Sequence, residues 1–142
     1  MRELELVLHA TFADVARATE HLRDHLPAWL AGDARHAVEL ALAEVLTNIV
    51  EHGYHGGALE DIRVRLLDRP GGLEVDVCDR GRPIPDGRLE QADETTFLFD
   101  PTDIAGLPEG GMGLALIKAA FDEVRYASHD GLNQLHLVLR FR

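Results

Sequence analysis

The chain has 142 residues, close to the usual size of one domain, so we expect a single domain over residues 1–142. Its formal net charge of −11 argues against a nucleic-acid-binding protein, because phosphate contacts need clustered Lys and Arg, and against docking on an anionic membrane. No signal-peptide pattern and no bilayer-length apolar stretch is present, and the single cysteine, Cys78, excludes a disulfide within the chain. We therefore expect a cytoplasmic protein.

The first part of the chain predicts one strand and two helices. Residues 4–8 alternate between leucine and other side chains, which predicts a short strand. Residues 13–30 have a helical period, but Pro27 is expected to kink this helix or end it early. Asp33 is expected to cap a second helix that runs to about His52 with a continuous apolar face.

A hairpin and a long irregular segment follow. Residues 62–66 and 73–77 alternate between apolar and charged side chains, and Pro70-Gly71-Gly72 between them predicts a turn. The segment from 81 to 110 is rich in Gly, Pro, Asp and Thr and has little periodicity. A loop of this length in a compact domain is typically functional or mobile.

The last part predicts a helix over 112–121 and strands over 124–128 and 132–141, joined by a turn at Asp130-Gly131. The complete order is β-α-α-β-β-loop-α-β-β. This order predicts an α/β fold, a two-layer sandwich in which a mixed, mostly antiparallel sheet carries helices on one face.

Glu44 and Asn48 form the first candidate site. Residues four apart lie on one helical face, so these two side chains lie together at the edge of an apolar surface. The Asn48 oxygen suits Mg²⁺, which prefers oxygen ligands and keeps several waters. Glu44 suits a base that acts on a nearby hydroxyl. The alternative is that both residues lie at the solvent boundary of the helix without a chemical role.

Asp79 and Gly81 form the second candidate site, directly after the strand that ends at Cys78. An aspartate at the end of a buried strand is well placed to accept a hydrogen bond from a ligand, and the glycine lets that ligand approach the backbone. The alternative is an ordinary Asp turn that ends the strand.

The third candidate site is the glycine-rich run from Glu109 to Leu114, which opens a helix. Free backbone N–H groups and the helix dipole at such a place suit a phosphate group. The run is neither a P-loop nor a dinucleotide-binding fingerprint. A flexible hinge is the alternative interpretation.

Taken in sequence, the three sites resemble the N, G1 and G2 boxes of the GHKL ATPase superfamily, whose domain has the Bergerat ATP-binding fold. The resemblance extends from about Leu4 to Phe141, and the branch that fits best is that of the anti-sigma factor serine/threonine kinases. The segments that carry it are LAEVLTN at 42–48, EHGY at 51–54, GGMGL at 110–114 and FDEV at 121–124.

The resemblance implies that ATP and Mg²⁺ are the cofactors. Glu44 would be the general base, Asn48 would bind Mg²⁺, and Asp79 would hydrogen-bond to the adenine amino group, with Gly81 beside the base. The remaining nucleotide-binding residues would be Gly110, Gly111, Met112, Gly113 and Leu114. Of these, Gly111 and Gly113 would contact the phosphates through their backbone. Residues 88–108 would form the ATP lid.

The resemblance also implies a function. A kinase of this branch phosphorylates a STAS-domain anti-anti-sigma protein, binds a sigma factor and often forms a homodimer. Two features depart from the family pattern. Pro83 stands in place of a second G1 glycine, and the expected lid has no lysine to offset phosphate charge, since Lys118 is the only lysine of the chain. The alternatives are a non-catalytic module that only binds partners, with or without ATP, and an ATPase or regulatory domain of a larger enzyme.

Overall fold

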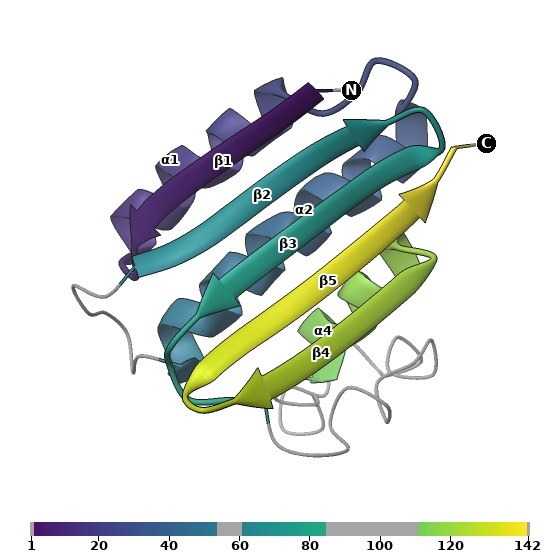
Figure 1. Ribbon diagram of the computed structural model, residues 1–142. Helices are drawn as coiled ribbons and strands as arrows, with labels where there is room; N and C mark the ends of the chain where they lie inside the picture. The colour runs from purple at the N-terminus through teal and green to yellow at the C-terminus, as the bar shows by residue number, and fades with distance from the viewer. Residues whose placement is uncertain (1, 54–60, 85–110, 142) are drawn as a thin grey trace, which may run out of the picture.

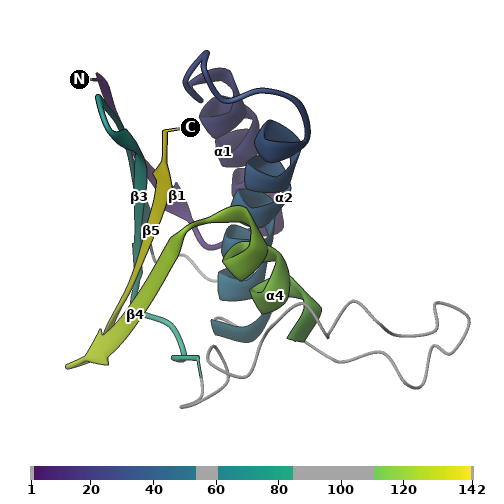
Figure 2. The same cartoon turned by 90° about the vertical axis from the view of Figure 1, so that its right-hand side faces the viewer.

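The structure, a computed structural model, describes residues 2–53, 61–84 and 111–141. Five strands form one sheet in the order β1-β2-β3-β5-β4, and the helices cover one of its faces (Figures 1 and 2). The elements are β1 (Arg2–His9), α1 (Phe12–Asp24), α2 (Gly32–Asn48), the π-helix η1 (Ile49–Gly53), β2 (Asp61–Arg69), β3 (Gly72–Asp79), α4 (Gly111–Ala120), β4 (Glu123–His129) and β5 (Leu132–Arg140).

The expected two-layer sandwich is confirmed, with one refinement of the sheet. Every pairing between the described strands is antiparallel, including that of β3 with β5, so the described sheet is antiparallel throughout rather than mixed. Both expected hairpin turns are present. Asp130 and Gly131 have φ angles of 52° and 80°, which matches the left-handed turn that a tight antiparallel hairpin prefers.

The core lies between the sheet and the helices. α2 contributes a continuous buried face, and α4 packs beside it with buried Leu114, Ile117 and Ala120. Along β3 and β5 every second residue is buried, as expected for strands that have one face on a core. The side chains of α2 in this core are Val38, Ala41, Leu42, Val45 and Leu46.

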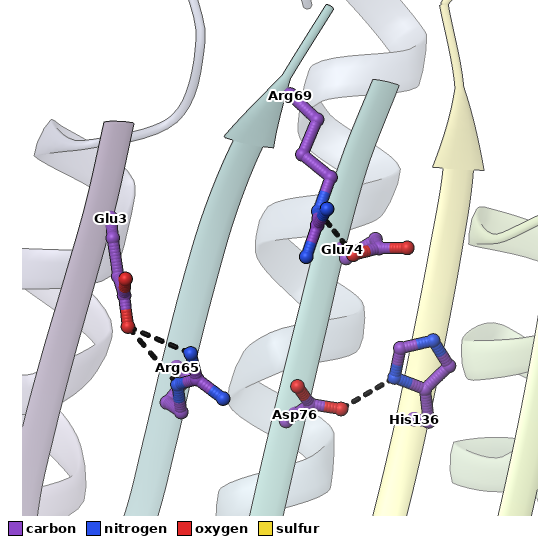
Figure 3. Close-up of polar contacts among 6 residues, drawn as sticks. All are labelled: Glu3, Arg65, Arg69, Glu74, Asp76 and His136. Atoms are coloured by element: carbon purple, nitrogen blue, oxygen red, sulfur yellow. Dashed lines mark hydrogen bonds and ion pairs between the residues drawn. The ribbon is translucent and has the colours of Figure 1, made fainter. Parts of the chain in front are cut away.

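The opposite face of the sheet is charged. Figure 3 shows its cross-strand pairs, with Glu3 of β1 accepting from Arg65 of β2 at 2.8 Å and Arg69 of β2 paired with Glu74 of β3 at 2.6 Å. Asp76 of β3 contacts His136 of β5. Such pairs favour one register, because a shift by one residue would turn these charges into the core.

Two details of the helices bear on the expectations. α1 ends at Asp24, before Pro27, which agrees with the early end that the proline predicted. The prediction that Asp33 caps the second helix is wrong. α2 begins at Gly32, its N-cap is Ala31 without a side-chain hydrogen bond, and Asp33 lies in the first turn. There its charge is favourable through the helix dipole instead.

Arg35 closes the connection between α1 and α2. Its guanidinium donates to the carbonyl oxygens of Arg23 and Leu30, each at 3.0 Å, and of Pro27 at 3.2 Å, and it pairs with Glu39 at 3.3 Å. Arg23 lies in the last turn of α1, and Pro27 and Leu30 lie in the connection, so one side chain links the end of α1 to the segment before α2.

Replacing Arg35 by alanine is expected to lower the free energy of unfolding by about 1–3 kcal/mol, because these carbonyl groups lose charged donors. Urea denaturation measures the difference. Arg17→Ala is the control, since Arg17 pairs with Asp14 at an exposed position and should change stability by less than about 0.5 kcal/mol. Equal losses in both variants would contradict the closing role of Arg35.

Candidate functional site

Four element ends lie toward the same end of the sandwich. In the lower part of Figure 2 lie the last turns of α2, the end of β3, the turn between β4 and β5 and the start of α4. Figure 1 shows the same four segments in the lower part of the molecule. The three segments singled out in the sequence lie on these ends. Glu44 and Asn48 lie in the second half of α2, Asp79 ends β3, and Gly111 begins α4.

Asp79 is the central residue of a small group of hydrogen-bonded polar residues at this end of the sheet. Its side chain is 7% exposed, and its Oδ1 accepts hydrogen bonds from the Gly81 N–H at 2.8 Å and from Asn133 Nδ2 at 2.9 Å. Burial raises the pKa of the Asp79 carboxyl, while the hydrogen bonds from Asn133 and Gly81 oppose that rise. Oδ2 makes no hydrogen bond with any residue that the structure describes.

Asn133 was not identified from the sequence. It is 2% exposed and, with Asp79, is one of the two buried polar or charged residues among those that the structure describes. Its Nδ2 also donates to the Gly81 carbonyl oxygen at 2.8 Å, and its Oδ1 accepts from Ser128 Oγ at 2.7 Å. The backbone after β3 is held a second time further on, where the Ile84 N–H donates to the Tyr126 hydroxyl at 2.9 Å.

A sequence signal for Asn133 existed. Leu135, Leu137 and Leu139 of β5 are buried, and Asn133 continues the same two-residue period. It also stands directly opposite Asp79 in the sheet register. A polar residue in phase with a buried row needs a hydrogen-bonding partner, and here that partner is the site carboxylate.

Glu44 and Asn48 lie half-buried on α2, one turn apart, beside the buried face of that helix. Neither side chain makes a hydrogen bond or an ion pair with any other described residue. η1 follows directly, and single π-helical turns are frequent at functional sites.

The third segment is described only in part. α4 begins at Gly111 as a regular helix through Gly113, whereas Gly110 and the lid expected over 88–108 lie outside the described residues. The Leu114 side chain is buried in the core, so a nucleotide would meet this residue only through its backbone.

The donor set fits Mg²⁺ that is held mainly by phosphate. No group of three or more His, Cys, Asp or Glu side chains suited to a metal occurs in residues 2–53, 61–84 and 111–141. Mg²⁺ commonly takes one or two protein ligands together with substrate phosphates and waters, and the oxygen of the Asn48 carboxamide is of the type that would hold it.

Comparison with known proteins gives the class of this fold and site. Residues 8–139 match the family described as the histidine kinase-like ATPase domain, and the chain belongs to that family. The family to which the sequence boxes pointed is thereby confirmed. No described helix is both long and apolar enough to span a membrane.

The particular relatives are proteins named serine-protein kinase RsbW. The relative from Bacillus pumilus is 34% identical over 97 residues, which are 67% of this chain and 59% of that protein. The one from Bacillus subtilis is 30% identical over 96 residues, covering 67% and 58%, and the one from Listeria monocytogenes is 31% identical over 107 residues, covering 72% and 66%. The chain thus matches about three-fifths of the length of the first two.

Solved structures support the fold. The RsbU and RsbW domains of Rv1364c from Mycobacterium tuberculosis superpose with a TM-score of 0.63 at 20% identity, over 99% of this chain and 32% of that one. The catalytic domain of the histidine kinase ThkA superposes with a TM-score of 0.52 at 17% identity, over 99% of this chain and 97% of that one.

Proposed function

We propose that this end of the sandwich binds ATP through its adenine base. The observation that carries the proposal is the buried Asp79 carboxylate, which has one oxygen saturated and the other without a partner among the described residues. A carboxylate oxygen of a largely buried residue favours a ligand with a donor group, and the exocyclic amino group of adenine is such a donor. Gly81, without a side chain, leaves room for the ring beside it.

The phosphate groups are assigned to the start of α4. Backbone N–H groups at Gly111, Met112, Gly113 and Leu114 lie in the first turn of a helix, where the helix dipole favours negative charge. Gly110 precedes them in the chain. Asn48 supplies an oxygen for Mg²⁺, which neutralises phosphate charge when bound.

The proposed activity is transfer of the γ-phosphoryl group to a serine or threonine hydroxyl. Glu44, half-buried and without a hydrogen bond to a described residue, lies one helical turn from Asn48 and is suited to accept the hydroxyl proton. Phosphoryl transfer depends mostly on positioning and charge neutralisation, so a single base suffices beside Mg²⁺. The relatives named serine-protein kinase support this assignment.

The proposed role is that of an anti-sigma regulatory factor in the cytoplasm. Its substrate would be a STAS-domain anti-anti-sigma protein, its second partner a sigma factor, and its working form a homodimer. The relatives named serine-protein kinase RsbW support the kinase part of this role. The net charge of −11 favours basic protein surfaces as partners.

Asp79→Asn tests the nucleotide assignment. The amide keeps an oxygen for Gly81 and Asn133 but turns an N–H group toward the adenine amino group, so two donors face each other. ATP affinity is expected to fall about 10- to 100-fold in titration calorimetry with Mg²⁺. Asp76→Asn is the control, because Asp76 lies on the opposite face of the same strand. Unchanged affinity in Asp79→Asn would refute the adenine assignment and leave a partner-binding module as the function.

The same variant has a pH signature. A carboxyl whose pKa is raised by folding stabilises the fold when protonated, and that contribution is lost as the pH rises through its folded-state pKa. Asp79→Asn does not titrate, so its stability relative to wild type should increase between about pH 4 and pH 7. Urea midpoints at both pH values measure this trend, and a constant difference would contradict it.

A further inference from the structure

A row of three polar residues crosses the sheet behind the proposed base site. Ser128 of β4 stands directly opposite Asn133 of β5, and Asn133 stands directly opposite Asp79 of β3. Their side chains form one chain of hydrogen bonds, from Ser128 Oγ to Asn133 Oδ1 and from Asn133 Nδ2 to Asp79 Oδ1. The inner face of the sheet is otherwise apolar along β3 and β5, so this row is a distinct feature.

The orientation of the Asn133 amide follows from its partners. One side of the amide faces two acceptors, the Asp79 carboxylate and the Gly81 carbonyl oxygen, at 2.9 and 2.8 Å. Only the NH₂ group satisfies both, because the amide oxygen there would face two other oxygens. The amide oxygen therefore points at Ser128, whose hydroxyl donates to it and locks this orientation.

This arrangement saturates one carboxylate oxygen of Asp79. The Oδ1 atom accepts from both Gly81 and Asn133, which uses its two lone pairs. With Oδ1 fixed, rotation of the carboxylate would break both hydrogen bonds, so Oδ2 is the oxygen that would accept from the proposed base. Asn133 also ties Gly81 to Asp79, which sets the spacing between the acceptor and the backbone beside the base.

We infer that Asn133, locked by Ser128, is a positioning residue that sets the preference of the site for a 6-amino purine over a 6-oxo purine. This inference rests on the proposed function, since it concerns how Asp79 recognises the base. Without the amide donor, Oδ1 keeps only the hydrogen bond from the Gly81 N–H, so the carboxylate is held less firmly and can turn. The pKa of Asp79, which the Asn133 hydrogen bond holds down, would also rise, and a protonated carboxyl donates to a 6-oxo group.

The test is the ratio of ATP affinity to inosine triphosphate affinity, measured by titration calorimetry with Mg²⁺ on the full chain. Ser128→Val removes the locking hydroxyl from an exposed strand residue, where a β-branched side chain suits the strand and folding is retained. The ratio is expected to fall about tenfold, the effect of one neutral hydrogen bond. Asn133→Ala should lower it at least as far.

Two controls separate positioning from packing. Ser128→Thr keeps the hydroxyl and should retain the wild-type ratio of affinities. Gln134→Ala changes the exposed neighbour of Asn133 and should leave that ratio unchanged. A purely structural role would weaken both nucleotides equally and leave the ratio constant in every variant. That result, with wild type still preferring ATP, would overturn the positioning role alone. A wild type that binds both nucleotides equally, or neither, would overturn the proposed function and this inference together.

Discussion

Glu44→Ala is expected to lower phosphoryl transfer to a STAS-domain protein by about 100- to 10,000-fold, the range over which a positioned general base contributes. ATP binding should persist, because Glu44 carries the same sign of charge as the phosphates and makes no hydrogen bond with the described residues. Transfer is measured with labelled ATP, and binding with calorimetry. The two measurements together separate the loss of a base from the loss of a binding residue.

The control for this experiment is Glu20→Ala. Glu20 is an exposed glutamate of α1, so its removal changes the net charge by the same amount on another helix. It should leave transfer unchanged. Normal transfer by Glu44→Ala would show that Glu44 is not the base, and joint loss of binding and transfer would show that it supports the site structurally.

Gly72→Ala is expected to cost about 3 kcal/mol or more and to prevent normal pairing of β3 with β5. A Cβ atom at this position would lie 2.2 Å from the Leu139 carbonyl oxygen and 3.0 Å from Arg140 Cα. The φ of Gly72 is 150°, in the region that side chains rarely adopt. Both neighbours are backbone atoms of the adjacent strand, so neither yields without displacing that strand.

Gly71→Ala is the matched control, because a Cβ atom there meets nothing within 4 Å. Thermal and urea unfolding of the two variants measure the contrast, and Gly71→Ala should remain within about 0.5 kcal/mol of wild type. Equal stability of both variants would contradict the close approach of β3 and β5 at Gly72.

The fold was largely predictable from the sequence because its signals are local. Two-residue alternation located the strands, and the glycine turns at Gly71 and Gly131 located the hairpins. The early end of α1 followed from the restricted backbone of Pro27. The position where α2 begins did not follow, because Asp33 is a favourable capping residue in sequence, whereas the helix begins one residue earlier, at Gly32, whose φ is 60°.

Only those residues of the candidate site that belong to the three sequence motifs were predictable. Glu44, Asn48 and Asp79 stand in short patterns with recognisable spacing, whereas Asn133 acts on Asp79 from 54 positions away in the chain. That contact depends on the pairing of β5 with β3, which are far apart in the chain, and no local sequence pattern predicts this pairing. Ser128 is similarly uninformative in sequence, since an exposed serine in a strand ordinarily has no partner to specify.

The pairing of β3 with β5 has a consequence for how the protein matures during synthesis. Asp79 is made well before Asn133, so the carboxylate stays without its amide partner until the last hairpin has left the ribosome and joined the sheet. If the proposed nucleotide site is correct, a nucleotide that binds only the completed site would stabilise the sheet in which β3 and β5 are paired.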